Sequence, residues 1–405
     1  MKKILLIILD GLGDRPIPQL GNKTPLEAAN TPHLDFLAKY GKCGLMEPVY
    51  TTKIPTSEEC HFSLFGYDPR KYVIKRGIFT AMGSGLRVKP GDVALRGNFS
   101  TVDEKLNIID RRAGRITNTA PFIKSLNGLV IEGVKFLIKN AGGHRIGIVM
   151  RGKNLSPDIS DGDPHYSDLK RKVKKIVPLK KNKKAKFTAE VLNKFLERAH
   201  LILKNHPLNK KREKAGLFPA NYILVRGASS FQKLPTFQEK YGLKACGVAG
   251  KLLYQQIAKF LGMRLIKVKG ANGLPNTNLK GKIKAVKEAL KKYDFVFLHI
   301  KATDSLAEDG DYKGKRAFIE KVDEHLKPLL ASKNILIVVS ADHCTCSLLK
   351  RHCIGPVPIL IYGNGRDKVE HFSERECKKG GLGTFKSLEL IPRLLLYRKE
   401  DLSYD

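Results

Sequence analysis

Four short segments of the chain are continuously apolar and rich in β-branched residues. They span residues 2–10, 293–304, 334–343 and 357–363. Such runs are typical of strands that are buried on both faces of a sheet. Between and around them, apolar residues recur at helical spacing, for example after Gly250. Strands that alternate with helices predict an α/β fold with a mostly parallel sheet flanked by helices.

The middle of the chain has a different character. Its periodicities are mixed, and glycines and basic residues interrupt short strand-like pieces. A helix is predicted over residues 189–205, followed by a strand that starts at 221 and ends at Arg226. Because 405 residues exceed what one hydrophobic core usually serves, we expect two domains. A smaller α/β domain (residues 76–235) is predicted to be inserted into one formed by residues 1–75 and 236–405.

The net charge is strongly positive, with 74 Lys and Arg against 39 Asp and Glu, or +35. Such a charge first suggests a nucleic-acid partner. However, the densest basic run, residues 170–187, has little aromatic interleaving, and the sequence contains no RNA-binding, zinc-finger or homeodomain pattern. We therefore interpret the charge as a solvated basic surface and expect no specific nucleic-acid partner.

Hydrophobicity and cysteine content restrict the compartment. A hydrophobic fraction of 42% excludes disorder for most of the chain, and no apolar run approaches the length of about 20 residues that spans a bilayer. The apolar start ends at Asp10 without a cleavage site, which indicates a first strand rather than a signal peptide. Seven scattered cysteines form no disulfide framework, so we expect a reducing cytoplasm and no membrane partner.

Three of the predicted strands end in carboxylates: Asp10, Asp304, and Asp342 followed by His343. The carboxyl ends of parallel strands meet at one edge of a sheet, where ligands of open α/β folds bind. Carboxylates gathered there repel one another unless cations compensate them. With His352 nearby in sequence, the oxygen and imidazole donors suit Mn, Zn or Mg. A single aspartate at a strand end is as readily a helix cap, but three together favour a metal site.

A second pattern is the segment TSEECHFSLFGYDP at residues 56–69. Thr56 and Glu59 have the spacing of a capping box, which predicts that a helix starts here. A hydroxyl at a helix N-terminus lies in positive potential, and this favours an alkoxide. Ser57 is therefore a candidate nucleophile as well as a simple capping-region residue. His61, one turn later, is either a residue that orients substrate or a packed core histidine.

Two long motifs stand in tandem near the start, ILDGLGDRPIPQLGNKTPLEAANTPHLD and SEECHFSLFGYDP, and shorter ones follow: IDRRAGRI, GDPH, NYILVRGAS, YGLKACGVAG, FVFLHIKATD, SADHCTC, RHCIGPVPILI and KKGGLG. With these motifs the chain resembles the archaeal-type cofactor-independent phosphoglycerate mutases of the alkaline phosphatase superfamily, over nearly its whole length. The resemblance implies interconversion of 3-phosphoglycerate and 2-phosphoglycerate through a phosphoserine. It also implies two divalent metal ions, with manganese favoured and Mg, Zn or Co as alternatives, and no bisphosphoglycerate cofactor.

The resemblance also implies roles for individual residues. Ser57 matches the nucleophile, and Lys244 resembles a lysine that supports phosphoryl transfer near it. Arg226 resembles an arginine that grips the substrate from the inserted domain. The metal ligands matched are Asp10, Asp342 and His343 for the ion that also holds Ser57, and Asp304 and His352 for the other ion. Residues in motifs associated with glycerate binding are Arg111, Arg112, Arg115, Asp163 and His165.

One position departs from the family pattern, which is Asp-x-x-x-His after the second strand. Here the chain reads Asp304-Ser-Leu-Ala-Glu308. A carboxylate can replace imidazole as a ligand and would favour Mn or Mg over Zn. Asp309 and Asp311 in the same acidic turn are alternatives, and loss of this metal position is another.

Three cysteines and one histidine near the predicted ligands need an interpretation. Cys344, Cys346 and Cys353 lack the paired spacing of a structural zinc site. We expect them to be small buried thiols that fill space. His299 lies inside an apolar strand, and we expect it to be a core residue.

The sequence leaves two rival functions. A phosphomonoester hydrolase of the same superfamily needs the serine and the metals but no clamp for an enclosed glycerate. A non-catalytic basic protein that binds RNA, with a decayed metal site, would account for the charge and for Glu308. The arginines of the inserted domain favour the mutase.

Overall fold

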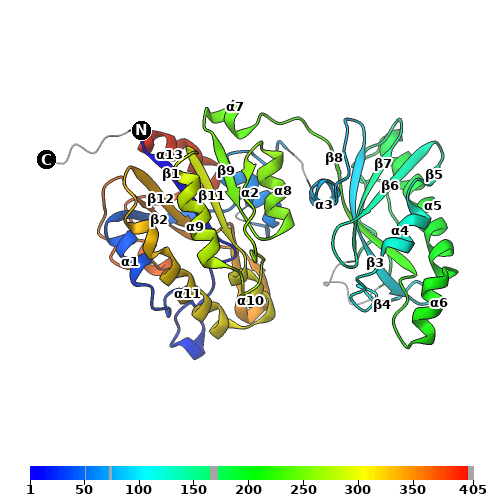
Figure 1. The fold of residues 1–405 in the computed structure, drawn as a ribbon, viewed down its shortest axis with the longest axis horizontal. Coiled ribbons are helices and arrows are strands. Elements are labelled where there is room, and N and C mark those ends of the chain that lie inside the picture. The colour runs from blue at the N-terminus through cyan, green and yellow to red at the C-terminus, as the bar shows by residue number, and fades with distance from the viewer. Residues whose placement is uncertain (51, 73–74, 165–171, 400–405) are drawn as a thin grey trace. The chain divides into compact units, whose positions relative to one another are not determined.

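A computed structural model describes residues 1–50, 52–72, 75–164 and 172–399 (Figure 1). Contacts within the chain define two units, Met1–Tyr72 with Leu234–Asp405, and Val73–Lys233. The borders fall at 72/73 and 233/234, where the sequence patterns suggested 75/76 and 235/236. None of the described helices combines the length and the apolar character needed to cross a membrane.

The first unit is built on an eight-stranded sheet. In spatial order the strands are β10 (Arg264–Leu265), β9 (Ala245–Val248), β11 (Phe295–Ile300), β1 (Lys3–Leu9), β12 (Ile335–Ser340), β15 (Val357–Tyr362), β2 (Gly41–Glu47) and β16 (Thr384–Lys386). The first five strands in this order are parallel, and β15 runs antiparallel to both of its neighbours. The predicted mostly parallel α/β sheet is thus confirmed.

Every residue of β11 and of β12 is buried, which shows that both faces of this sheet are covered, as the flanking helices require. Helices α1, α11 and α9 pack side by side, and α2 packs against α8. A short hairpin of β13 (Cys344–Cys346) and β14 (Arg351–Cys353) follows β12. The helices are α1 (Pro32–Lys39), α2 (Ser57–Leu64), α7 (Phe237–Tyr241), α8 (Leu252–Phe260), α9 (Leu279–Leu290), α10 (Ala302–Asp309), α11 (Tyr312–Leu330), α12 (Glu374–Cys377) and α13 (Leu390–Lys399).

The second unit contains a six-stranded sheet with antiparallel pairings. Its order is β4 (Ile108–Asp110), β3 (Val93–Val102), β7 (Arg145–Arg151), β6 (Val134–Asn140) and β5 (Val130–Ile131), and β8 (Tyr222–Ser230) also pairs with β3. The helices are α3 (Arg76–Gly83), α4 (Ala120–Leu126), α5 (Lys183–Lys204) and α6 (Pro207–Lys214).

The helices of the second unit lie on opposite faces of its sheet. Phe195 of α5 stacks on Phe136 of β6 at 3.9 Å between ring centroids, in the same core as Ile146 and Ile148 of β7. A side chain at Gly147, between these two residues, would point to the other face of the sheet, because successive strand residues alternate. A Cβ there would meet α3 at 2.8 Å from the Cα of Ala81, so the glycine allows this close approach.

Three boundaries differ from those predicted. Helix α5 begins six residues before the predicted start at 189, because Asn182 caps it by accepting from the Ala185 amide. Strand β8 does not end at Arg226 but continues to Ser230. Asp304 does not close β11; it lies in the first turn of α10.

Candidate active site

Three buried aspartates come together at the carboxyl edge of the parallel strands. Asp10 directly follows β1, Asp342 lies just beyond β12, and Asp304 is in the first turn of the helix that follows β11. Because these strands are adjacent and parallel, their ends lie side by side. All three side chains are no more than 2% exposed. The structure therefore places three carboxylates in a site almost closed to water.

The first cluster consists of Asp10, Asp342 and His343, whose ligand atoms lie within 4.8 Å of one another. The Nε2 atom of His343 is 3.2 Å from Oδ2 of Asp342 and 3.6 Å from Oδ1 of Asp10. The hydroxyl oxygen of Ser57 is 3.5 Å from the same Nε2 atom. Carboxylates, imidazole and a serine hydroxyl thus meet around one point.

The second cluster consists of Asp304, His343 and His352, so His343 is common to both. The Nε2 atom of His352 is 3.3 Å from Oδ1 of Asp304 and 3.9 Å from Oε1 of Glu308. The rings of His343 and His352 stack with centroids 3.7 Å apart. The β13–β14 hairpin therefore delivers His352 to the cluster that Asp304 begins.

Ser57 is the first residue of helix α2, and 3% of it is exposed. Thr56 caps this helix by accepting from the Glu59 amide, and the Glu59 carboxylate accepts from the Thr56 amide. The predicted capping box is confirmed. It fixes the helix N-terminus, with its positive end, at the first cluster.

The pKa values of the buried carboxylates are shifted in different directions. Burial and the charge of Asp10 raise the pKa of Asp342 to about 7. Burial also opposes ionisation of Asp10 and Asp304, but Lys301 and neighbouring histidines hold the pKa of both below the usual range. Burial lowers the pKa of His343 to about 4, so this imidazole is neutral and able to act as a ligand near neutral pH.

Burial raises the pKa of Glu308, and the charge of Asp304 adds to the shift. The pKa of His352 is raised to about 8, because its hydrogen bond and ion pair with Asp304 outweigh burial. A cluster of side chains with pKa values shifted in opposite directions is typical of sites that bind a cation or catalyse a reaction.

The donor set fits divalent metal ions. Both clusters offer carboxylate oxygens and imidazole nitrogens, which suit Mn, Zn or Mg. Within the described part of the chain, the buried Oδ2 atom of Asp342 accepts no hydrogen bond, as expected of an oxygen arranged for a cation. Gly11, with φ of 63°, keeps this space open, since a Cβ there would lie 2.5 Å from Oγ1 of Thr345 and 2.8 Å from the Cβ of Asp304.

Hydrogen bonds around the clusters orient the ligands. Thr345 donates from Oγ1 to Oδ1 of Asp304 at 2.6 Å, and His299 Nε2 lies 2.9 Å from Oδ2 of Asp10. The sequence placed His299 in the core; it is fully buried and also contacts a candidate ligand. The sequence signal was a histidine within an otherwise apolar strand. Carboxylate ligands are commonly hydrogen-bonded in this way.

Lys301 was also missed by the sequence analysis. Its ammonium group lies 3.1 Å from Oδ1 of Asp10 and also contacts Oδ2 of Asp304. The available signal was its spacing, since a lysine three residues before Asp304 lies on the same helical face.

Lys244 is not at this site. It precedes β9, whose Ala245 pairs with Phe295, and Phe295 in turn pairs with Ile4. Asp10 lies six residues beyond Ile4 along the parallel direction, about 20 Å at the usual strand rise. The prediction that Lys244 supports transfer near Ser57 is therefore wrong, because a residue before a parallel strand lies at the opposite edge of the sheet.

His61 lies in the core behind the first cluster. It is fully buried, packs on Tyr254 with ring centroids 4.7 Å apart, and places Nδ1 2.8 Å from the Ser57 carbonyl oxygen. Its Nδ1 atom is also 3.4 Å from Oδ2 of Asp342. Of the two interpretations that the sequence left open, this placement favours the packed core histidine over a residue that contacts substrate.

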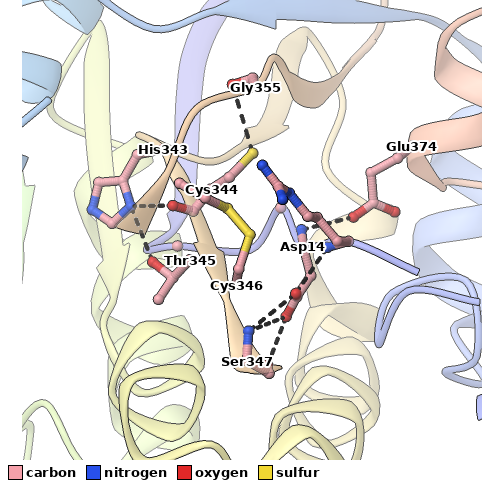
Figure 2. Close-up of a disulfide and its surroundings, with 12 residues drawn as sticks. Asp14, His343, Cys344, Thr345, Cys346, Ser347, Gly355 and Glu374 are labelled. Atoms are coloured by element: carbon pink, nitrogen blue, oxygen red, sulfur yellow. Dashed lines mark hydrogen bonds between the residues drawn. A yellow bond between two sulfur atoms is a disulfide. The ribbon is translucent and has the colours of Figure 1, made fainter. Parts of the chain in front are cut away.

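Cys346 and Cys353 form a disulfide across the β13–β14 hairpin, with Cα atoms 5.9 Å apart (Figure 2). The expectation of free thiols beside the ligands is thus wrong for these two residues, because antiparallel pairing of β13 with β14 brings them near each other. Cys344, whose Sγ is 3.6 Å from the Gly355 carbonyl oxygen, is a free buried thiol as expected.

The loop after Asp10 is fixed to this hairpin. Asp14 accepts from the Ser347 hydroxyl at 2.6 Å (Figure 2) and from the buried ammonium of Lys315 at 2.9 Å. Lys315 also donates to the Gly11 carbonyl oxygen at 2.9 Å. These bonds hold the first cluster and the hairpin in a fixed relation.

The second unit brings together part of the predicted substrate set. Arg111 donates to Oδ1 of Asp163 at 2.5 Å, and Nε of Arg226 is 3.9 Å from the other oxygen of that carboxylate. Burial, followed by the charge of Arg76, lowers the pKa of Arg226. Arg112 caps its own turn by donating its amide to Asp110. Arg115 is exposed, and His165 lies outside the described residues.

Comparison with known proteins identifies the family. Residues 2–392 match the model of the Metalloenzyme superfamily. The 2,3-bisphosphoglycerate-independent phosphoglycerate mutase 1 of Archaeoglobus fulgidus is 45% identical over 96% of each chain, and that of Methanocaldococcus jannaschii is 43% identical over 97% of this chain and 96% of its own. Among solved structures, the cofactor-independent phosphoglycerate mutase of Thermoplasma acidophilum is 36% identical, with a TM-score of 0.71 over 98% of this chain and all of its own. A Pyrococcus horikoshii protein is 33% identical, with a TM-score of 0.84 over 100% and 99%. The chain therefore belongs to the archaeal 2,3-bisphosphoglycerate-independent phosphoglycerate mutases of the metalloenzyme superfamily.

Proposed function

We propose that the protein interconverts 3-phosphoglycerate and 2-phosphoglycerate through a phosphoserine on Ser57. The observation that carries the proposal is the position of Ser57, at a capped helix N-terminus and 3.5 Å from a histidine common to two metal-type clusters. A coupled mutase assay after chelation, with Mn, Mg, Zn or Co added back, tests it. The appearance of 2-phosphoglycerate only after metal is restored is the expected result.

In the reaction, the Ser57 oxygen forms a bond to phosphorus as the bond to the glycerate oxygen breaks, and that oxygen recovers a proton. The other hydroxyl of the retained glycerate then attacks the phosphoserine, and Ser57 is released. When bound, divalent ions supply charge that stabilises the serine alkoxide and the transferring oxygens. We assign Asp10, Asp342 and His343 to one ion, and Asp304, His352 and Glu308 to the other, with manganese favoured by the carboxylate-rich set.

Retention of the glycerate distinguishes a mutase from a hydrolase, because water would otherwise consume the phosphoserine. We assign retention of the glycerate to the arginines beside Asp163, since an arginine guanidinium binds a carboxylate in bidentate fashion. The comparisons do not favour the hydrolase or the RNA-binding alternative. Measurement of free phosphate against 2-phosphoglycerate separates the hydrolase from the mutase.

The first prediction concerns this clamp. Arg226→Ala is expected to reduce mutase turnover by about 100-fold while phosphoserine formation falls by less than about fivefold, because only the second transfer needs a held glycerate. Rapid-quench measurement of the two steps checks this. Arg151→Ala is the matched control, since Arg151 pairs with Asp92 in the same sheet. Equal loss in both steps would remove Arg226 from the clamp.

A second prediction concerns Glu308, the departure from the family pattern. Glu308→Ala is expected to weaken manganese binding at one of two sites by about tenfold or more, as loss of a coordinating group does. Calorimetric titration checks this. Asp309→Ala serves as control: both carboxylates are exposed, but Glu308 is the one that lies 3.9 Å from Nε2 of His352, and Asp311 is occupied in capping α11. A larger loss with Asp309→Ala than with Glu308→Ala would reassign the ligand.

We place the enzyme in the cytoplasm, with phosphoglycerate as its small anionic partner. Five of its seven cysteines are buried free thiols, and one local bond is no disulfide framework.

A further inference from the structure

Lys301 contacts carboxylates of both clusters at once. Its Nζ atom donates to Oδ1 of Asp10 at 3.1 Å and to Oδ2 of Asp304. The carboxylates are fully buried, and the lysine side chain is 15% exposed. Asp10 belongs to the first cluster and Asp304 to the second, so a single ammonium group joins the two.

The charge of the site explains why a cation is needed there. Asp10, Asp304 and Asp342 lie together with almost no exposure to water. A buried carboxylate is tolerated only when it is paired or neutralised, and like charges in one site raise that cost. The Nζ atom of Lys301 contacts both Asp10 and Asp304, whereas His352 pairs with Asp304 and Glu308, so Lys301 is placed to balance the negative charge of Asp10 and Asp304 together.

We propose that Lys301 is an internal counter-ion that competes with divalent metal for Asp10 and Asp304. It contacts both carboxylates that the metal also requires, and on Asp10 it contacts Oδ1, the oxygen 3.6 Å from Nε2 of His343, so a bound ion and the ammonium group compete for the same negative charge. A metal ion and an ammonium group nearby also repel each other. The lysine thus stabilises the metal-free site and lowers the affinity for metal. This inference rests on the proposed metal clusters, and does not depend on the mutase reaction.

The sign of the effect separates this role from a purely structural one. Loss of a structural residue distorts the ligands and weakens metal binding. Loss of a competing cation strengthens metal binding, and at the same time destabilises the metal-free protein because Asp10 and Asp304 are left uncompensated. A purely structural role of Lys301 would not move the two quantities in these opposite directions.

The test uses the full chain and manganese alone as the probe. Lys301→Met and Lys301→Gln are titrated with Mn²⁺ by calorimetry, and each melting temperature is measured with and without the ion. We expect both variants to bind manganese at least about tenfold more tightly, with a lower melting temperature without metal and a larger rise on adding it. The glutamine variant keeps an N–H donor, on a side chain one atom shorter, and removes the charge, so it is informative if the methionine variant does not fold.

Lys282→Met is the matched control. Lys282 is another fully buried lysine of the same unit, but its ammonium donates to the carbonyl oxygen of His299 and to no ligand carboxylate. Its variant is expected to lose stability with manganese affinity unchanged within about twofold. Equal or weaker manganese affinity in Lys301→Gln would overturn the proposal. A wild-type protein that binds manganese but forms no 2-phosphoglycerate would instead overturn the proposed reaction and leave this one standing.

Discussion

Ser57→Ala is expected to reduce mutase turnover by about 10⁴-fold or more while the fold persists. This change removes only the hydroxyl group, and without its oxygen no phosphoserine forms. The measurements are the coupled mutase assay and capture of ³²P on protein from labelled substrate, which is expected only for the wild type.

The control for Ser57→Ala is Ser63→Ala. Ser63 is a buried serine of the same helix, and its hydroxyl lies 2.6 Å from that of Ser387, away from the clusters. Its loss is expected to cost about 1 kcal/mol of stability with turnover within about twofold of wild type. Full turnover and label capture in Ser57→Ala would disprove the nucleophile assignment.

Asp342→Asn is expected to weaken manganese binding by about 100-fold or more and to abolish turnover at moderate metal concentration. The change keeps the shape of the side chain but removes the charge of the carboxylate whose buried Oδ2 accepts no hydrogen bond from the described residues. Calorimetric titration with manganese and the metal-dependent rise in melting temperature measure this loss.

The same substitution is expected to stabilise the metal-free protein at high pH. Asp342 has a pKa of about 7 in the fold, because of burial and Asp10, against about 3.9 in an unfolded chain. Between these values the folded state holds a proton that the unfolded state has lost, so the free energy of unfolding falls as pH rises through this window. Asp342→Asn removes that contribution, and its melting temperature without metal should exceed that of wild type above pH 7.

Asp323→Asn provides the contrast. Asp323 is equally buried, but it accepts from the amides of His33 and Leu34 and so holds α11 to α1. Its substitution is expected to lower the melting temperature without changing manganese affinity. If Asp342→Asn behaves in the same way as Asp323→Asn, Asp342 is a structural residue and not a ligand.

The sequence predicted those features that depend on local pattern and strand polarity. Continuous apolar runs located β1, β11, β12 and β15, and the capping box located the start of α2. The expectation that parallel strands end at one edge brought Asp10 and Asp342 together without knowledge of the strand order. These predictions needed only the chain direction, the continuous apolar runs and the spacing of the capping box.

The errors arose where a prediction needed a contact between distant segments. Lys244 was assigned from its motif alone, and nothing in that motif says at which end of β9 it lies. His299 and Lys301 act through side chains that reach Asp10 on a neighbouring strand, which only the register reveals. The pairing of Cys346 with Cys353 required knowing that the two short segments form a hairpin.

The disulfide has a consequence for local unfolding. A two-stranded hairpin is barely stable by itself, and short surface elements normally open far more often than the whole domain. The bond between Cys346 and Cys353 spans only seven positions, so it removes separation of β13 from β14 as a local event. His352, next to the bonded Cys353, is then displaced only when the hairpin moves as a whole, away from the loop after Asp10. The time that His352 remains at the second cluster is thereby linked to these contacts and not to the six-residue ladder alone.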